Sequence, residues 1–124
     1  MDSFAPDVVA AFDSANTVDV ETVGRRTGRQ RRTTVWVVVS DGVPYVRSEY
    51  GDAGQWYRNA LVEPTVKVHL GGRAVDAVAT RVDDAATQTA VSDALREKYR
   101  RSSAVGVMVD PAVEPMTLAL APAA

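Results

Sequence analysis

The residues with the clearest chemical potential are five arginines that stand within eight positions of the segment GRRTGRQRR, residues 24–32. A guanidinium presents a planar fork of N–H donors that matches the oxygens of a phosphate group. Two glycines in the same segment allow a ligand to approach the backbone closely. The spacing predicts a site for an anion, although a solvated turn is the simpler alternative. The arginines are Arg25, Arg26, Arg29, Arg31 and Arg32.

A second group of candidate residues lies in RSEYGDAGQWYRN, residues 47–59. Arg47 and Ser48 end a predicted strand, and Gly51 leads into a helix that we expect to begin near Asp52. Free N–H groups at the start of a helix bind anions, whereas the carboxylate of Asp52 would cap those same donors. Both interpretations remain open.

Two aromatic residues, Trp56 and Tyr57, follow in the first turn of this helix. An indole and a phenol at that position can stack on a flat heteroaromatic ring. Aromatic residues at the start of a helix also commonly belong to the hydrophobic core. Ring contact is therefore a hypothesis for Trp56 and Tyr57.

Composition excludes several classes of site. The chain has no cysteine and one histidine, His69, so disulfides, thiolate metal sites and multi-histidine metal centres are excluded. The net charge is −2 while residues 25–32 contribute +5, so the remaining residues sum to −7. A local positive patch on an acidic protein favours a small anionic ligand over nucleic acid. Aromatic residues are also not interleaved with the arginines, as a single-strand platform requires.

Length and hydropathy predict one domain, residues 1–124. No apolar run approaches the roughly 20 residues that a membrane span needs. The N-terminal segment carries acids where a secretion signal has basic residues, so we expect a cytoplasmic protein without a membrane partner.

Hydrophobic periodicity indicates the elements that position the arginines. Residues 17–23 alternate as a half-buried strand, and residues 31–40 return as a strand that is apolar on both faces. Such a strand is central, with a barrel interior on one side and a helix or a partner subunit on the other. Asp41 and Gly42 form a hairpin turn into a third strand, residues 43–48.

The rest of the chain adds helices and three more strands. A helix ends before Pro64, a hairpin covers residues 65–82, and a helix capped by Asp83 or Asp84 covers residues 85–100. A flexible stretch, residues 101–115, precedes a last strand near residues 116–122, and a short helix begins at Pro6. The predicted class is mainly β with flanking helices (α+β), and a six-stranded antiparallel barrel is economical because closure removes the edges.

The motifs also carry a family resemblance. GRRTGRQR, the valine-rich strand and WYRNALVEPTVKV resemble the deazaflavin-dependent nitroreductase family of the split-barrel, flavin-binding superfamily, over roughly residues 18–83. An uncharacterised small bacterial family in the same superfamily is more similar, since it shares RSxxG, RWYR and VSDALRxKY stretches. The matching positions are Gly24, Arg25, Arg26, Thr27, Gly28, Arg31, Ser48, Trp56, Tyr57, Arg58, Asn59, Pro64 and residues 94–99.

The resemblance implies a homodimeric split barrel, with a deazaflavin coenzyme (F-420) or FMN in a groove between barrel and helix. The implied activity is hydride transfer to a small planar acceptor of quinone or nitro type, with the chemistry residing in the cofactor. It assigns no catalytic residue and no metal. The alternative is a non-catalytic split barrel that binds a small anionic ligand or serves as an interaction module. The candidate cofactor-binding residues are Arg25, Arg26, Arg31, Arg47, Ser48, Gly51, Trp56 and Tyr57.

Overall fold

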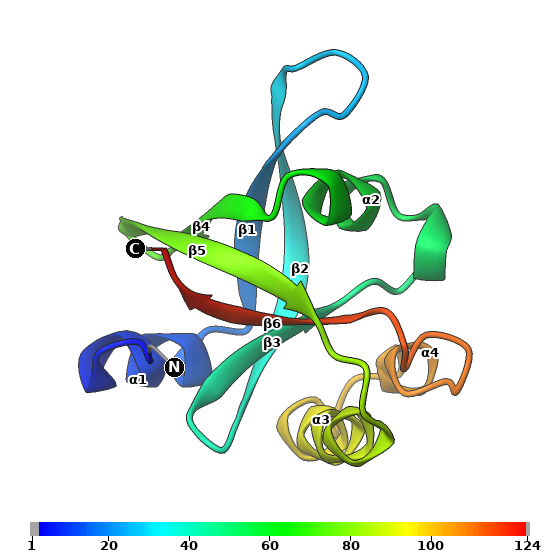
Figure 1. Cartoon of the computed structure of the whole chain (residues 1–124). Coiled ribbons are helices and arrows are strands. Elements are labelled where there is room, and N and C mark those ends of the chain that lie inside the picture. Colours follow the sequence, from blue (N-terminus) through cyan, green and yellow to red (C-terminus); the bar gives the residue numbers. More distant parts are fainter. Residues whose placement is uncertain (1–2, 124) are drawn as a thin grey trace.

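The protein is built around a closed antiparallel β-barrel (Figure 1). The structure is a computed structural model that describes residues 3–123, except for the side chain of Asp52. The strands follow one another around the barrel in the order β1-β2-β3-β6-β5-β4. This confirms the predicted α+β class and the six-stranded barrel. The strands are β1 (Thr17–Val23), β2 (Gln30–Ser40), β3 (Val43–Arg47), β4 (Thr65–Leu70), β5 (Arg73–Arg81) and β6 (Thr117–Pro122).

Strand β2 is the long strand that was predicted to be apolar on both faces. It pairs with β1 over residues 30–36 and with β3 over residues 37–40. Val35 and Val37 point into the barrel core, while Val38 lies on the opposite face in a second hydrophobic cluster. Helix α3 (Ala85–Lys98) packs against that outer face. Within the chain, a helix therefore covers the outer face of β2.

Helix α1 (Pro6–Ser14) lies beside one end of the barrel (Figure 1). Its Phe12 is fully buried in the cluster that fills the barrel, together with Val37 and Val68. Deleting a buried ring of this kind typically costs about 3–5 kcal/mol of stability. The N-terminal helix is thus part of the core.

Helix α3 begins at the predicted cap. The carboxylate of Asp84 accepts a hydrogen bond from the backbone N–H of Thr87 at 2.9 Å. Its buried stripe, Val91 and Leu95 followed by Tyr99, packs against Val38 as the helical spacing predicted. None of the helices within residues 3–123 is long and apolar enough to cross a membrane.

The stretch predicted to be flexible contains a short helix, α4 (Val105–Met108). Met108 is buried against the cluster beneath α3, and the partly buried Val105 packs on the same cluster. The prediction of a flexible segment was wrong here. These apolar residues pack on the cluster beneath α3, and the local sequence does not indicate that contact.

The loop after β3 differs in detail from the prediction. A 3-10 turn, η1 (Gly51–Ala53), comes first, and helix α2 (Gln55–Val62) begins at Gln55 instead of near Asp52. Gly54 is the N-cap residue and makes no side-chain capping bond. The predicted cap by Asp52 falls on a side chain outside the described residues. The helix ends before Pro64 as expected.

Candidate functional site

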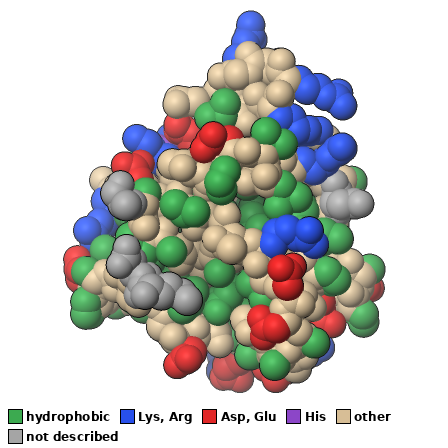
Figure 2. Space-filling view, viewed as in Figure 1, with side chains coloured by type: hydrophobic (Ala, Val, Ile, Leu, Met, Phe, Trp, Pro, Cys, Tyr) green, Lys and Arg blue, Asp and Glu red, His purple; other side chains and the backbone are tan. Residues whose placement is uncertain are grey.

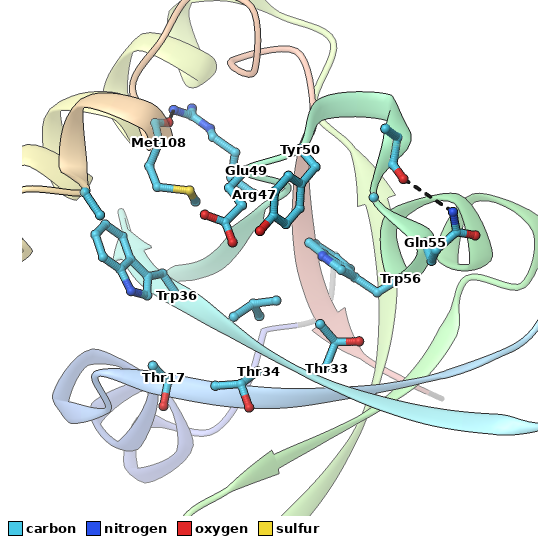
Figure 3. A pocket seen from close by; sticks show the side chains of 14 residues that line it. Thr17, Thr33, Thr34, Trp36, Arg47, Glu49, Tyr50, Gln55, Trp56 and Met108 are labelled. Atoms are coloured by element: carbon cyan, nitrogen blue, oxygen red, sulfur yellow. Dashed lines mark hydrogen bonds between the residues drawn. The ribbon is translucent and has the colours of Figure 1, made fainter.

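A cavity of about 470 Å³ lies between β2, the loop after β3, α2 and α4 (Figure 3). This volume falls in the range of about 300–1,000 Å³ that is usual for small-molecule sites. The cavity has two ends. Thr33, Gln55 and Trp56 line the end nearer the arginine-rich hairpin, which we call the Trp56 end, and Trp36 and Met108 line the other, the Trp36 end.

The arginine-rich turn connects β1 to β2 and projects beyond the barrel (Figure 1). The backbone N–H of Gly24 donates to the carbonyl of Arg29 at 2.7 Å, and that of Gly28 donates to the carbonyl of Gly24 at 2.8 Å. Gly28 has a positive φ of 71°, which other residues adopt only with strain. Figure 2 shows Lys and Arg side chains, in blue, at the tip and along one side of this projection.

Arg25 is attached to helix α2. Its backbone N–H and its Nη1 both donate to Oδ1 of Asn59, at 3.2 and 2.8 Å. The Asn59 amide donates in turn to the hydroxyl of Thr22, at 3.4 Å. Desolvation and the neighbouring guanidinium groups of Arg58 and Arg26 lower the pKa of Arg25. Positive charges from the hairpin and the helix therefore gather at one place.

The other hairpin arginines divide into two groups. Arg26, Arg29 and Arg31 are exposed, whereas Arg32 forms an ion pair with Asp19 at 3.1 Å. Arg31 precedes Thr33 by two residues on the same strand face, or about 7 Å along β2. Arg58 stands one helical turn after Gln55. Arg31 and Arg58 are thus close in the chain to residues that line the Trp56 end, and of these two only Arg31 was among the predicted residues.

Arg47 has a different environment from the one predicted. It is 2% exposed, and four of the five N–H groups of its guanidinium donate to protein acceptors. Burial lowers its pKa to about 10, so it is charged at neutral pH. The acceptors are the hydroxyls of Thr117 and Ser92, at 2.8 Å each, and the carbonyls of Met108 and Gln88, at 2.9 and 3.0 Å. Through these hydrogen bonds, Arg47 joins β3 to β6, α3 and α4.

Three more of the predicted residues serve the local structure. Ser48 is fully buried and its hydroxyl donates to the carbonyl of Gly51 at 2.8 Å, while Gly51 turns the chain with a φ of 60°. Tyr57 is 1% exposed and lies in the barrel core. Trp56 is also mostly buried, but it lines the cavity.

Sequence reasoning did not select several residues that line the cavity. Trp36 had been considered only as part of a covered strand face, and its ring stacks on Tyr99 with centroids 3.9 Å apart and planes 6° from parallel. Glu49 and Tyr50 are exposed and lie between the two indoles (Figure 3). Met108 comes from the segment predicted to be flexible. A tryptophan on the outer face of a strand was the one available signal.

A closed six-stranded antiparallel barrel with flanking helices is the architecture of the split-barrel proteins of flavin-binding type, and this chain has that fold. The chain belongs to the family of uncharacterized proteins conserved in bacteria named DUF2255, whose model matches residues 8–120. This confirms the resemblance to an uncharacterised bacterial family. No curated protein matches the sequence.

Solved structures support the fold assignment. The conserved hypothetical protein Rv2991 from Mycobacterium tuberculosis has a TM-score of 0.72 at 19% identity, covering 99% of this chain and 82% of that one. HutZ, the heme storage protein from Vibrio cholerae, has a TM-score of 0.67 at 17% identity, covering 98% and 92%. A reductase dependent on F-420-H2 (FDR-A) has a TM-score of 0.61 at 21% identity, covering 86% and 93%.

Proposed function

We propose that the protein binds a deazaflavin coenzyme or FMN and transfers hydride to a small planar acceptor of quinone or nitro type. The ring of the coenzyme would occupy the Trp56 end of the cavity. Its phosphate would meet the exposed arginines of the hairpin and Arg58 of α2. Similarity to an F-420-H2 dependent reductase supports the proposal at the level of the fold.

The single observation that carries the proposal is a cluster of positive charge beside a ring-sized cavity. The guanidinium groups of Arg58 and Arg26 lie close enough to Arg25 to lower its pKa, after the effect of desolvation. Mutual repulsion of this kind is relieved when an anion binds among the charges. Arg31 stands two residues before Thr33 and Arg58 three residues after Gln55, and both Thr33 and Gln55 line the cavity.

The residues fit the coenzyme only in part, and the fit narrows the predicted set. Arg26, Arg31 and Arg58 are the donors we assign to phosphate, while Trp56 provides a flat wall for the ring. Arg25 positions the hairpin through Asn59. The coenzyme supplies the hydride chemistry, and the protein binds it, orients it and shields one face of its ring from water.

Besides Arg25, four more of the predicted residues have supporting roles. The phosphate role predicted for Arg47 is not retained, since its donors are used inside the protein. Ser48 and Gly51 shape the loop that carries Glu49, and Tyr57 fills the barrel beneath Trp56. These residues would affect binding indirectly, by holding the walls of the cavity.

The test compares FMN with riboflavin, which lacks the phosphate, and adds F-420 as a separate titration. Binding is measured by quenching of tryptophan fluorescence and by isothermal titration calorimetry. We expect wild-type protein to prefer FMN over riboflavin by about tenfold or more, because each charged hydrogen bond contributes about 1.5–3 kcal/mol. The double variant Arg31→Ala/Arg58→Ala should reduce that preference, because it removes two of the three assigned phosphate donors.

A matched control removes two exposed guanidinium groups elsewhere, in Arg81→Ala/Arg101→Ala, and should keep the preference for FMN. If millimolar FMN and F-420 both leave fluorescence and thermal stability unchanged, the coenzyme proposal fails. Binding of inorganic phosphate that persists in that case, and that depends on Arg31 and Arg58, would support the non-catalytic alternative.

We also propose a homodimer. Leu61 and Val62 of α2 are 44% and 66% exposed, and apolar side chains of this size are commonly covered in an assembly. Multi-angle light scattering of the wild type and of Leu61→Glu/Val62→Glu checks this. A monomeric mass for the wild type at high concentration would contradict it.

A further inference from the structure

The carboxylate of Glu49 lies at the cavity without a partner. Its side chain is exposed, and within residues 3–123 it takes part in no hydrogen bond or ion pair. Figure 3 shows the carboxylate directed into the space between Trp36 and Tyr50. An unpaired carboxylate in such a position attracts a positive charge.

Arg47, the other charged residue of the cavity wall, does not neutralise Glu49. Its guanidinium is held by acceptors on α3, α4 and β6, as described above. One of these, Ser92, donates in turn to a carboxylate oxygen of Glu114 at 2.7 Å. Glu114 therefore supplies a counter-charge to Arg47, and the charge of Glu49 is available to a ligand.

Three aromatic rings from different elements share this cavity: Trp36 of β2, Trp56 of α2, and Tyr50 of the loop between β3 and α2. The face of an aromatic ring carries negative potential and attracts a cation placed over it. Trp36 is also held in place, because Tyr99 stacks on it. The aromatic rings and the carboxylate of Glu49 therefore both favour a positively charged ligand.

The remaining wall decides which kind of cation fits. Val35, Ala104 and Met108 are apolar, so a strongly hydrated ion would lose water there without replacement. A metal ion is not favoured either, because the described part of the chain holds no group of three or more His, Cys, Asp or Glu side chains that could bind one.

We propose that the Trp36 end of the cavity is a binding site for a weakly hydrated organic cation, with Glu49 as its counter-charge. The chemical class is an N-alkylated aromatic ring or a quaternary ammonium group. The site shares its cavity with the coenzyme proposed for the Trp56 end, and its charge preference is the opposite of that of the arginine cluster.

The experiment uses the full chain and three probes: N-methylquinolinium, its neutral counterpart quinoline at a pH where quinoline is uncharged, and choline. Affinities are measured by tryptophan fluorescence and calorimetry. The wild type should bind N-methylquinolinium about tenfold more tightly than quinoline, which is the effect of one close counter-charge supported by ring faces. Choline binding nearly as tight as that of N-methylquinolinium would assign the site to quaternary ammonium, and weaker choline binding would assign it to flat cations.

The decisive variant is Glu49→Gln, which keeps the shape of the side chain and removes its charge. It should bring the ratio of the two quinoline affinities close to one, while Glu97→Gln on the exposed face of α3 should leave the ratio unchanged. Equal affinities in the wild type, or a ratio that survives in Glu49→Gln, would overturn the proposal. The preference for FMN over riboflavin measures only the contribution of the arginine cluster. It therefore distinguishes failure of the coenzyme proposal from failure of the cation-site proposal.

Discussion

Oδ1 of Asn59 accepts two hydrogen bonds from Arg25, one from the backbone and one from the guanidinium, at 3.2 and 2.8 Å. Residues 34 positions apart are joined in this way, and they link the base of the projecting hairpin to the helix that walls the cavity. Any ligand held between the arginines and Trp56 would depend on this link for its geometry. The first prediction concerns its strength.

Asn59→Ala should destabilise the protein by about 1–3 kcal/mol, because the partly buried donors of Arg25 and the buried hydroxyl of Thr22 lose their partner. Arg58→Ala, an exposed change on the same helix, should stay within about 0.5 kcal/mol of the wild type. Urea unfolding gives the free energies, and amide hydrogen exchange at residues 24–29 reports loosening of the hairpin. Unchanged exchange rates in Asn59→Ala would show that the hairpin is held by other contacts.

Arg47→Met should cost about 3–5 kcal/mol in protein without coenzyme, since several buried acceptors lose their donor at once. Arg47→Lys should recover only part of this, because one ammonium cannot reach acceptors on three elements. Urea unfolding without added ligand is the measurement. A stable Arg47→Met protein that has lost FMN binding would instead restore the phosphate role.

Gly54 and Ser48 are in close contact. A Cβ atom on Gly54 would clash with Oγ of Ser48, so Gly54→Ala should destabilise the protein by about 1–3 kcal/mol. In Ser48→Ala/Gly54→Ala the nearest remaining atoms would be 3.5–3.6 Å away, which is ordinary contact. The double variant should therefore be more stable than Gly54→Ala alone. A double-mutant cycle in urea checks this, and simple additivity would contradict it.

Tyr99 should make the protein sensitive to alkaline pH. Burial raises the pKa of Tyr99 above its ordinary 10.0, and its hydroxyl lies 2.6 Å from the carbonyl of Asn16, to which it donates. The folded state thus holds the proton more tightly than the unfolded chain. Its stabilisation is complete below pH 10.0 and is lost as pH rises above that value towards the folded-state pKa.

The measurement for Tyr99 is the free energy of unfolding from neutral pH to above pH 10.0, in wild type and in Tyr99→Phe. Tyr99→Phe should be less stable at neutral pH but should decline less steeply in the alkaline range. It should still decline somewhat, because burial also raises the pKa of Tyr45. If the unfolding free energies of the two proteins fall in parallel as pH rises, Tyr99 is not the cause of the alkaline loss of stability.

The fold was largely predictable from local patterns. Alternation in residues 17–23, the doubly apolar strand that contains Trp36, and the stripe of Val91, Leu95 and Tyr99 each reflect one element packed on a neighbour. Helix α4 was not predictable, because four residues carry too little periodicity to indicate a helix. The start of α2 was misplaced because a 3-10 turn and an α-helix favour similar residues.

The site was less predictable, since it depends on what lies across the barrel. In the sequence, Arg47 looks like a ligand-binding arginine. Its partners Ser92 and Thr117 are far away in the chain, so the sequence does not show that they contact it. Arg25 and Arg31 look equivalent within GRRTGRQR, yet one is tied to Asn59 and the other is exposed. Strand register decides which arginine contacts the protein and which is exposed, and the run of arginines alone does not indicate that register.

The strand order has a consequence for how the protein is made. Strand β6 fills the gap between β3 and β5, so both neighbours wait for residues 117–122 to leave the ribosome. At about 5–20 residues per second, the stretch between β5 and β6 takes a few seconds to synthesise. During that interval the nascent chain exposes two unpaired strand edges, which are the parts of a sheet most prone to pair with another chain.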